Sequence, residues 1–293
     1  MSRPREAIAR GAPPIQRAAW IDGALRRGAE ATLSVFDRGA RDGEGLFETL
    51  RVHGGRPFQW ERHLERLVVS AAELGFPVPP SSRALRAGLG EVLAAENLND
   101  AVARITVTRG IPGGRPARAG CWIEAEPVEA RLWRGTRRHG ADVILSRRPF
   151  APGPLGGHQT TSRLAYSLAR DEARAAGADE AILLSDEGEV IEGAASNVFA
   201  VLGAEVATPP RSSGLLPGIT RDFVLSQCAL LDIRVRAAAL WRDELLLARE
   251  VFLTNSVQGI VPVATLEGRP LPERAFAALM QNAHTQAVEA EIG

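Results

Sequence analysis

The chain of 293 residues contains no lysine, so arginine supplies all 35 of its basic side chains. It has only two cysteines, Cys121 and Cys228, which lie far apart in largely apolar surroundings. Two such thiols predict buried side chains and argue against a disulfide framework or a metal site. No apolar run approaches the ~20 residues that a membrane-spanning helix needs, so we expect no membrane partner.

The chain also has no excess charge of either sign, because 35 acidic residues balance the 35 basic ones. Charge therefore gives no argument for a nucleic-acid partner, and we expect none. The N-terminus is rich in arginine and proline and lacks the apolar core of a secretory signal. We expect a flexible arm over residues 1–18 and a cytoplasmic location.

The length suffices for two compact domains, each with its own core. Strand-like and helix-like segments come in blocks rather than in strict alternation, which predicts an α+β fold and not a Rossmann sheet. The Pro/Gly-rich stretch 149–157 is the predicted linker between domains. It separates a small N-terminal α+β domain, residues 19–148, from a larger C-terminal domain, residues 158–293.

Several local elements follow from spacing and from turn residues. Strands are expected at residues 19–23, 31–36, 46–52, 103–108, 121–125, 142–146, 181–184, 205–208, 233–236 and 251–254. Thr160, Thr161 or Ser162 can cap a helix that begins near Arg163. Ser81 or Ser82 can cap another, and the last helix is expected from residue 273 to about 288.

Four places in the sequence contain candidate binding residues. In LLPGITRD, the backbone N–H groups of Ile219 and Thr220 open a helix, which suits phosphate, although the motif by itself better describes a well-capped helix. Arg66 in HLERL is by default a solvated or ion-paired residue on a helix face, and Ser256 is by default a loop serine. Glu192 lies among apolar residues and needs a partner, which could be one of the many arginines.

The order and spacing of these motifs resemble the fold-type IV (class IV) pyridoxal-phosphate (PLP) aminotransferases, from about Trp20 to Pro262. GADEAILLSDEGEVIEGAASNVF is similar to the centre of that family, and TNSVQGIVPV is closest to its aminodeoxychorismate lyase-like branch. The resemblance implies a two-domain D-amino-acid-aminotransferase-like fold, with a mixed sheet in the small domain and a β-rich large domain. It also implies a homodimer acting on an amino acid and a 2-oxo acid, or on aminodeoxychorismate.

The resemblance also implies roles for single residues. Arg66, Ile219, Thr220 and Ser256 would bind the phosphate of PLP, and Glu192 would hold its pyridine nitrogen. On the substrate side it points to Arg109 and Arg163. From the residues alone, Arg109 equally meets a neighbouring acid, and Arg163 is a surface arginine at a helix start. No metal site is expected.

The position of the family's catalytic lysine falls on Gln159, in QTTSRL. A glutamine amide is neither nucleophile nor base near neutral pH, so we expect noncovalent PLP and an impaired covalent step. Coding bias explains a lysine-free surface but would place arginine here, so Gln159 is either an introduced substitution or a natural loss. Two alternatives stay open: a pseudoenzyme that binds PLP, its amine form PMP or another phosphate ligand, and a diverged enzyme working without an internal aldimine.

Overall fold

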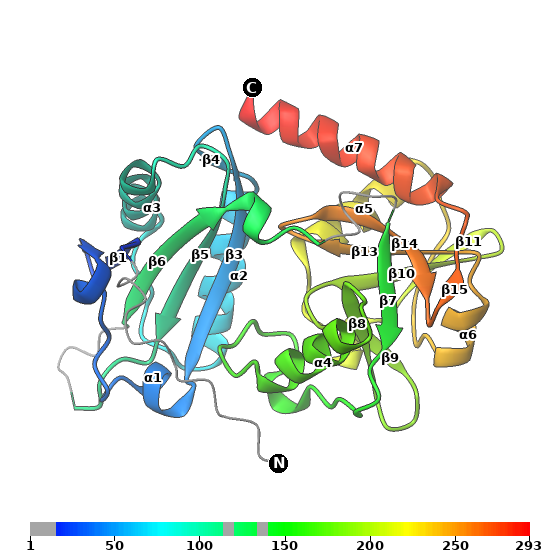
Figure 1. The fold of residues 1–293 in the computed structure, drawn as a ribbon, viewed down its shortest axis with the longest axis horizontal. Helices are drawn as coiled ribbons and strands as arrows, with labels where there is room; N and C mark the ends of the chain where they lie inside the picture. Colours follow the sequence, from blue (N-terminus) through cyan, green and yellow to red (C-terminus); the bar gives the residue numbers. More distant parts are fainter. Residues whose placement is uncertain (1–15, 114–119, 134–139) are drawn as a thin grey trace, which may run out of the picture.

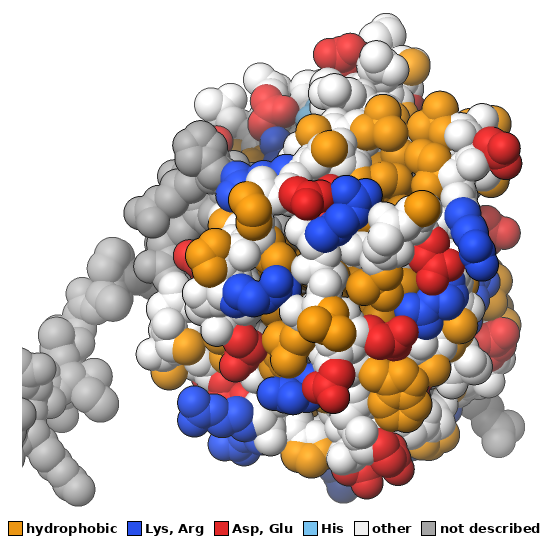
Figure 2. Space-filling view, turned by 90° about the vertical axis from the view of Figure 1, so that its right-hand side faces the viewer, with side chains coloured by type: hydrophobic (Ala, Val, Ile, Leu, Met, Phe, Trp, Pro, Cys, Tyr) orange, Lys and Arg blue, Asp and Glu red, His pale blue; other side chains and the backbone are white. Residues whose placement is uncertain are grey.

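The computed structural model describes residues 16–113, 120–133 and 140–293. Two β-sheets, each covered by helices, lie side by side (Figure 1). Most of the predicted N-terminal arm lies outside the described residues. On the face shown in Figure 2, acidic and basic side chains are interspersed, without a patch of one sign.

The first sheet is antiparallel and has the order β2-β1-β6-β5-β3-β4. Its strands are β1 (Ala18–Ile21), β2 (Ala24–Arg27), β3 (Gly45–His53), β4 (Arg56–Pro57), β5 (Ala101–Thr108) and β6 (Cys121–Pro127). The accompanying helices are α1 (Arg38–Asp42), α2 (Trp60–Glu73) and α3 (Ser82–Glu96), with 3-10 turns η1 (Gly28–Glu30) and η2 (Val128–Ala130). The apolar stripes of α2 and α3 pack on the sheet and form one core, in which Leu50, Leu67 and Leu89 are buried.

The second sheet is mixed and has the order β12-β11-β10-β13-β14-β7-β8-β9, with β15 paired to β14. Its strands are β7 (Ala141–Leu145), β8 (Glu180–Leu184), β9 (Val190–Gly193), β10 (Asn197–Leu202), β11 (Glu205–Thr208), β12 (Val235–Ala237), β13 (Glu250–Asn255), β14 (Gly259–Leu266) and β15 (Arg269–Pro270). The helices are α4 (Leu164–Ala175), α5 (Ile219–Leu230), α6 (Arg242–Leu247) and α7 (Ala275–Ile292), with 3-10 turns η4 (Gly153–Leu155) and η5 (Arg211–Ser213). Strands β8 and β10 are almost wholly buried, as expected for strands covered on both faces.

The chain passes from the first sheet to the second before residue 149, and so ahead of the predicted linker at residues 149–157. Strand β7 pairs in parallel with β14 and β8, so it belongs to the second sheet although it precedes residue 149. Its apolar alternation predicted a strand but gave no information on its partners. The strand pairing therefore changes between β6 and β7.

Two local predictions were wrong. Residues 31–36 form no strand, and Val35 and Phe36 are exposed there. Helix α4 has Arg163 as its N-cap and no side-chain cap. The hydroxyls of Thr161 and Ser162 instead donate to the carbonyl of Gly43, at 2.9 and 3.2 Å, and so tie α1 to this loop.

Helix α7 crosses from the second sheet to the first (Figure 1). The Glu291 carboxylate accepts a hydrogen bond from the backbone N–H of Gln59, the N-cap of α2, at 2.7 Å. Arg56 Nη1 donates to the carbonyl of Ile292 at 2.5 Å. The end of α7 therefore holds the beginning of α2, the helix that contains His63 and Arg66.

The described part of the chain offers neither a membrane-spanning helix nor a cluster of metal ligands. None of its helices combines the length and the apolar character needed to cross a membrane. Within the same residues, no group of three or more His, Cys, Asp or Glu side chains is placed to hold a metal ion. Cys121 and Cys228 are both buried.

Candidate active site

A cavity of about 540 Å³ opens between the two sheets. Phe47 and Arg104 of the first sheet line it, as do Glu192 and Asn197 of the second. Except for Arg109, the predicted site residues all line this cavity: Arg66, Gln159, Arg163, Glu192, Ile219, Thr220 and Ser256. Folding thus gathers at one place residues that are up to 190 positions apart in sequence (Arg66 to Ser256, 256 − 66).

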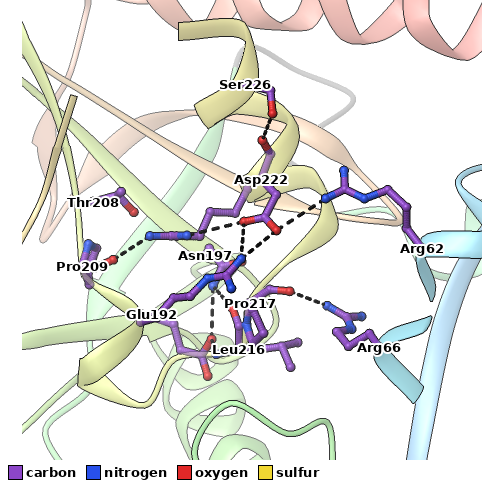
Figure 3. A network of polar contacts seen from close by, with 12 residues as sticks. Arg62, Arg66, Glu192, Asn197, Thr208, Pro209, Leu216, Pro217, Asp222 and Ser226 are labelled. Atoms are coloured by element: carbon purple, nitrogen blue, oxygen red, sulfur yellow. Dashed lines mark hydrogen bonds and ion pairs between the residues drawn. The ribbon is translucent and has the colours of Figure 1, made fainter. Parts of the chain in front are cut away.

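Arg66 is held by a buried acid. Its Nε and Nη2 atoms donate to the two carboxylate oxygens of Glu48 at 2.8 and 2.6 Å. Its Nη1 atom donates to the carbonyl of Pro217 at 2.9 Å (Figure 3). Burial alone would lower the pKa of Arg66, but the ionised Glu48 outweighs it and raises that pKa. The guanidinium therefore stays charged and is fixed in direction by a two-point contact.

Glu48 also binds His63, which reaches Ser256. His63 Nδ1 lies 2.7 Å from Glu48 Oε2, and His63 Nε2 lies 3.4 Å from Ser256 Oγ. Burial would raise the pKa of Glu48, but Arg66 and His63 outweigh it and lower that pKa. Burial lowers the pKa of His63, although Glu48 opposes this. At neutral pH the acid is therefore ionised and the imidazole neutral.

The start of α5 presents free backbone donors. Its N-cap, Gly218, provides no side-chain cap, so the first N–H groups of the helix have no intrahelical or capping partner. A Cβ at Gly218 would lie 2.0 Å from Asn197 Oδ1, which explains why glycine stands here. Ile219 and Thr220 at this helix end, together with Arg66 and Ser256, form a set of donors suited to a phosphate group, which we term the anion cup.

Asp222 lies in the first turn of α5 but is engaged away from the anion cup. Its carboxylate accepts from Arg211 Nη2 at 3.0 Å and from Arg62 Nη2 at 3.5 Å (Figure 3). Ser226 Oγ donates to the backbone carbonyl of Asp222 one turn further along the helix. The charge of Asp222 still contributes to the raised pKa of Arg66, after that of Glu48.

Glu192 is the second buried acid of the cavity, with 4% of its surface exposed. Its Oε1 accepts from Tyr166 Oη at 3.1 Å, and its Oε2 accepts from the Leu216 N–H at 3.0 Å and from Asn197 Nδ2 at 3.3 Å. All these donors are neutral, and within the described part of the chain no arginine forms an ion pair with Glu192, although the charge of Arg163 acts to lower its pKa. Burial raises the pKa of Glu192 to about 7, which leaves it poised to share a proton with a ligand base.

Two arginines flank the cavity on the side of Phe47. Arg163 Nη2 donates to the carbonyl of Ala194 at 2.8 Å, and its Cζ lies 3.6 Å from the centre of the Tyr166 ring. Arg104 Cζ lies 3.7 Å from the centre of the Phe47 ring. Burial lowers the pKa of both arginines. Sequence reasoning missed Arg104, although a charged residue between apolar neighbours in a predicted strand was an available signal.

Arg109 does not reach the cavity. Its Nη1 atom lies 3.6 Å from Glu44 Oε2, and its Nη2 atom donates to the carbonyl of Leu74. The guanidinium also lies over the Phe76 ring. Of the two roles that the sequence left open, Arg109 therefore has the contact with a neighbouring acid in this structure, and Arg104 is the arginine of β5 that lines the cavity.

Gln159 lies beside the anion cup. Its Oε1 atom accepts a hydrogen bond from Arg66 Nη2 at 3.1 Å, and its backbone carbonyl accepts from the Phe47 N–H at 2.9 Å. The amide thus faces the cavity and is oriented by the same arginine that Glu48 fixes. A neutral amide in this position can accept or donate a hydrogen bond but cannot supply a nucleophilic nitrogen.

Comparison with known proteins identifies this arrangement. Residues 45–266 match the family model for class IV amino-transferases. The branched-chain-amino-acid aminotransferase of Escherichia coli K12 is 33% identical over 261 residues, which are 85% of this chain and 84% of that one.

Solved structures agree with the sequence match. A hypothetical aminotransferase from Mycobacterium tuberculosis in a PLP-bound form superposes with a TM-score of 0.82 and 27% identity, covering 94% of this chain and 99% of that one. A protein assigned as a 4-amino-4-deoxychorismate lyase from Legionella pneumophila gives a TM-score of 0.79 and 27% identity, covering 88% and 96%. The predicted fold-type IV architecture is confirmed, and the chain belongs to the class IV aminotransferase family.

Proposed function

We propose that this chain binds PLP or PMP noncovalently, in a class IV aminotransferase or aminodeoxychorismate lyase-like site whose covalent step is impaired by Gln159. One observation carries the proposal. The same cavity holds an uncapped helix end beside a fixed arginine, and a buried carboxylate with a pKa of about 7. The first suits a phosphate and the second suits a protonated ring nitrogen.

The residues present fit the cofactor at both ends. The N–H groups of Ile219 and Thr220, with Arg66 and Ser256, would hold the phosphate. Glu192 would hold the pyridine nitrogen. When bound, the cofactor supplies an electron sink for negative charge at the substrate Cα. Without a lysine, this chain has no side chain that could bond the cofactor as an imine.

Glu192 and its donors would keep a proton at the ring nitrogen. The hydrogen bonds from Tyr166, Asn197 and Leu216 fix the carboxylate in one orientation. Because the site is buried, a cation facing the carboxylate is screened little by water. Binding of the protonated ring would therefore shift Glu192 fully to its ionised form.

Arg104 and Arg163 favour a substrate with a carboxylate. Both guanidiniums line the cavity, are largely buried and contact aromatic rings and neutral acceptors. A substrate carboxylate would offset the unfavourable burial of these charges. Amino acids, 2-oxo acids and aminodeoxychorismate all contain this group, so this feature supports the class of substrate and not a choice among its members.

The test is the substitution Gln159→Lys, with Gln159→Arg as a matched control that adds charge without a nucleophile. After incubation with PLP and borohydride, we expect only the lysine variant to gain the intact mass of the reduced cofactor. Transaminase or lyase turnover should rise in that variant by about 10²–10⁴-fold, the usual range for a positioned proton-transfer group. Covalent trapping without any gain in turnover would favour the pseudoenzyme, and absence of trapping would contradict the proposed cofactor site.

We further propose that the two sheets belong to separate domains and that the protein is a homodimer. Exposed apolar side chains support the dimer: Val35 (75% exposed), Phe36 (65%) and Leu164 (73%). They lie on two segments joined through the carbonyl of Gly43. Sedimentation of the wild type and of Phe36→Asp tests this, with dimer expected for the first and monomer for the second; a wild-type monomer would contradict it.

A further inference from the structure

The hydrogen-bond chain Glu48–His63–Ser256 runs from the first sheet into the anion cup. Glu48 is buried and ionised, and an ionised carboxylate can only accept hydrogen bonds. His63 Nδ1, at 2.7 Å from it, must therefore be the protonated nitrogen. In the neutral imidazole this leaves Nε2 as a bare acceptor, facing Ser256 Oγ at 3.4 Å.

Ser256 has one hydroxyl proton, and two acceptors compete for it. With His63 neutral, that proton points to Nε2, and the serine presents only lone pairs to the cavity. A phosphate dianion likewise has only acceptor oxygens, so Ser256 can bind it only by donating the proton to it. His63 Nε2 would then face Ser256 Oγ with two lone pairs opposed, unless Nε2 gains a proton.

We propose that binding of a phosphate ligand at the anion cup is coupled to uptake of one proton by His63, which then donates to Ser256. This inference rests on the proposed function, because it requires a phosphate in the anion cup. In the complex, His63 donates to Glu48 through Nδ1 and to Ser256 through Nε2, so the serine proton is free for the ligand. His63 is thus a positioning residue that acts through Ser256.

The charged groups around His63 are consistent with uptake of a proton by its imidazole. The charged and titratable groups near it are Glu48 and Arg51 from β3, Arg62 and Arg66 from α2, and His284 from α7. In the absence of ligand, Arg66 already balances Glu48, and burial disfavours an imidazolium. A bound dianion adds two negative charges at the anion cup, and one further positive charge at His63 then becomes favourable.

Because ligand binding is coupled to proton uptake, the affinity for the ligand depends on pH. Through His63 the complex binds one proton more than the free protein and ligand, so this coupling weakens binding as the pH rises. The effect reaches about tenfold in affinity per pH unit once His63 is neutral in the free protein. The phosphate second ionisation near pH ~6 acts in the opposite direction, so the coupling shows most clearly above pH ~7.

The experiment measures proton uptake on binding of PMP to the full chain at pH 7 and pH 8. Titration calorimetry in two buffers of different ionisation enthalpy gives the number of protons directly. His63→Gln provides an amide that donates to Ser256 at every pH, and Ser256→Ala removes the hydroxyl altogether. Both should take up about one proton fewer than the wild type, whereas Ser256→Thr should restore the uptake.

The number of protons taken up distinguishes failure of the His63 coupling from failure of the cofactor site. Equal proton uptake in the wild type, His63→Gln and Ser256→Ala, with PMP bound in all three, would overturn the coupling and leave the cofactor site intact. Failure of the wild type to bind PMP would overturn the proposed function itself. The ³¹P chemical shift of bound PMP locates the proton: a dianion at pH 7 supports His63, and a monoanion contradicts it.

Discussion

Glu48 and Glu192 are both buried acids near the same cavity, yet their surroundings give them opposite properties. Glu48 is bound by the Arg66 guanidinium and by His63, and these outweigh burial and lower its pKa. Among the described residues, Glu192 receives hydrogen bonds only from neutral groups, and burial raises its pKa to about 7 although the charge of Arg163 opposes this. Glu48 has a cation in direct contact, whereas none of these residues places a cation in contact with Glu192.

The difference indicates that Glu48 has a structural role, whereas Glu192 is available to bind a cationic group of a ligand. A buried ion pair that is complete holds Arg66 in place for the phosphate. A buried acid without a cation is unfavourable when ionised, and a protonated ring nitrogen would relieve that cost. Four comparisons of variants test this contrast.

Glu48→Gln should lower the free energy of unfolding by about 3–5 kcal/mol, because it leaves the Arg66 charge buried and unpaired. Urea denaturation at pH 7 measures this loss. Glu192→Gln is the matched control, and at the same pH it should cost less than about 1 kcal/mol, since no cation depends on it. Equal losses in the two variants would contradict the contrast.

Stability should also depend on pH through Glu192. Its pKa is about 7 in the folded chain against an ordinary value of 4.5, so the folded state binds more protons between these values. The stabilisation is complete below pH 4.5 and is lost as pH rises through 7, a change of about 3 kcal/mol relative to Glu192→Gln. Glu48, whose pKa is lowered, acts in the opposite sense, with its stabilisation lost as pH falls. A flat difference between wild type and Glu192→Gln from pH 5 to pH 8 would exclude the raised pKa.

Glu192→Gln should weaken PMP binding by about 10–100-fold, the value of one hydrogen bond to a charged group. Calorimetry with PMP and with pyridoxamine, which lacks the phosphate, makes the comparison. Both ligands should lose affinity by a similar factor, because both have the ring nitrogen. A loss confined to PMP would place Glu192 near the phosphate instead and would refute its assignment.

Tyr166→Phe removes one of the donors to Glu192 and should raise the pKa of that carboxyl further, by less than about one unit. The pH at which stability declines should then move upward. In the Glu192→Gln background the same substitution should leave the pH profile unchanged, and this completes a double-mutant cycle. A shift that persists in that background would show that Tyr166 acts on another group.

Local signals in the sequence predicted much of the fold. Ser81 caps α3 by accepting from the Ala84 N–H, and α5 begins at Ile219 directly after Pro217-Gly218, as expected. These features depend on a few neighbouring residues. Fold-type IV membership followed from motifs in the correct order, and comparison confirms it.

The partners within the site could not be predicted in the same way. Glu48 lies 15 and 18 residues from His63 and Arg66, and only the packing of α2 on β3 brings them together. The contact of Gln159 with Arg66 spans 93 residues. The strand predicted at residues 31–36 did not form for a related reason: a strand needs a partner strand, and in the described part of the chain residues 31–36 pair with none. Long-range pairing is a property of the folded chain and leaves little trace in a single sequence.

The most direct test of the account is equilibrium dialysis of the purified chain against PLP, followed by borohydride reduction and intact-mass measurement. We expect about one PLP retained per chain in wild type, no covalent mass gain on reduction, and reduced retention in Glu192→Gln. Absence of PLP retention, or retention that does not depend on Glu192, would contradict it.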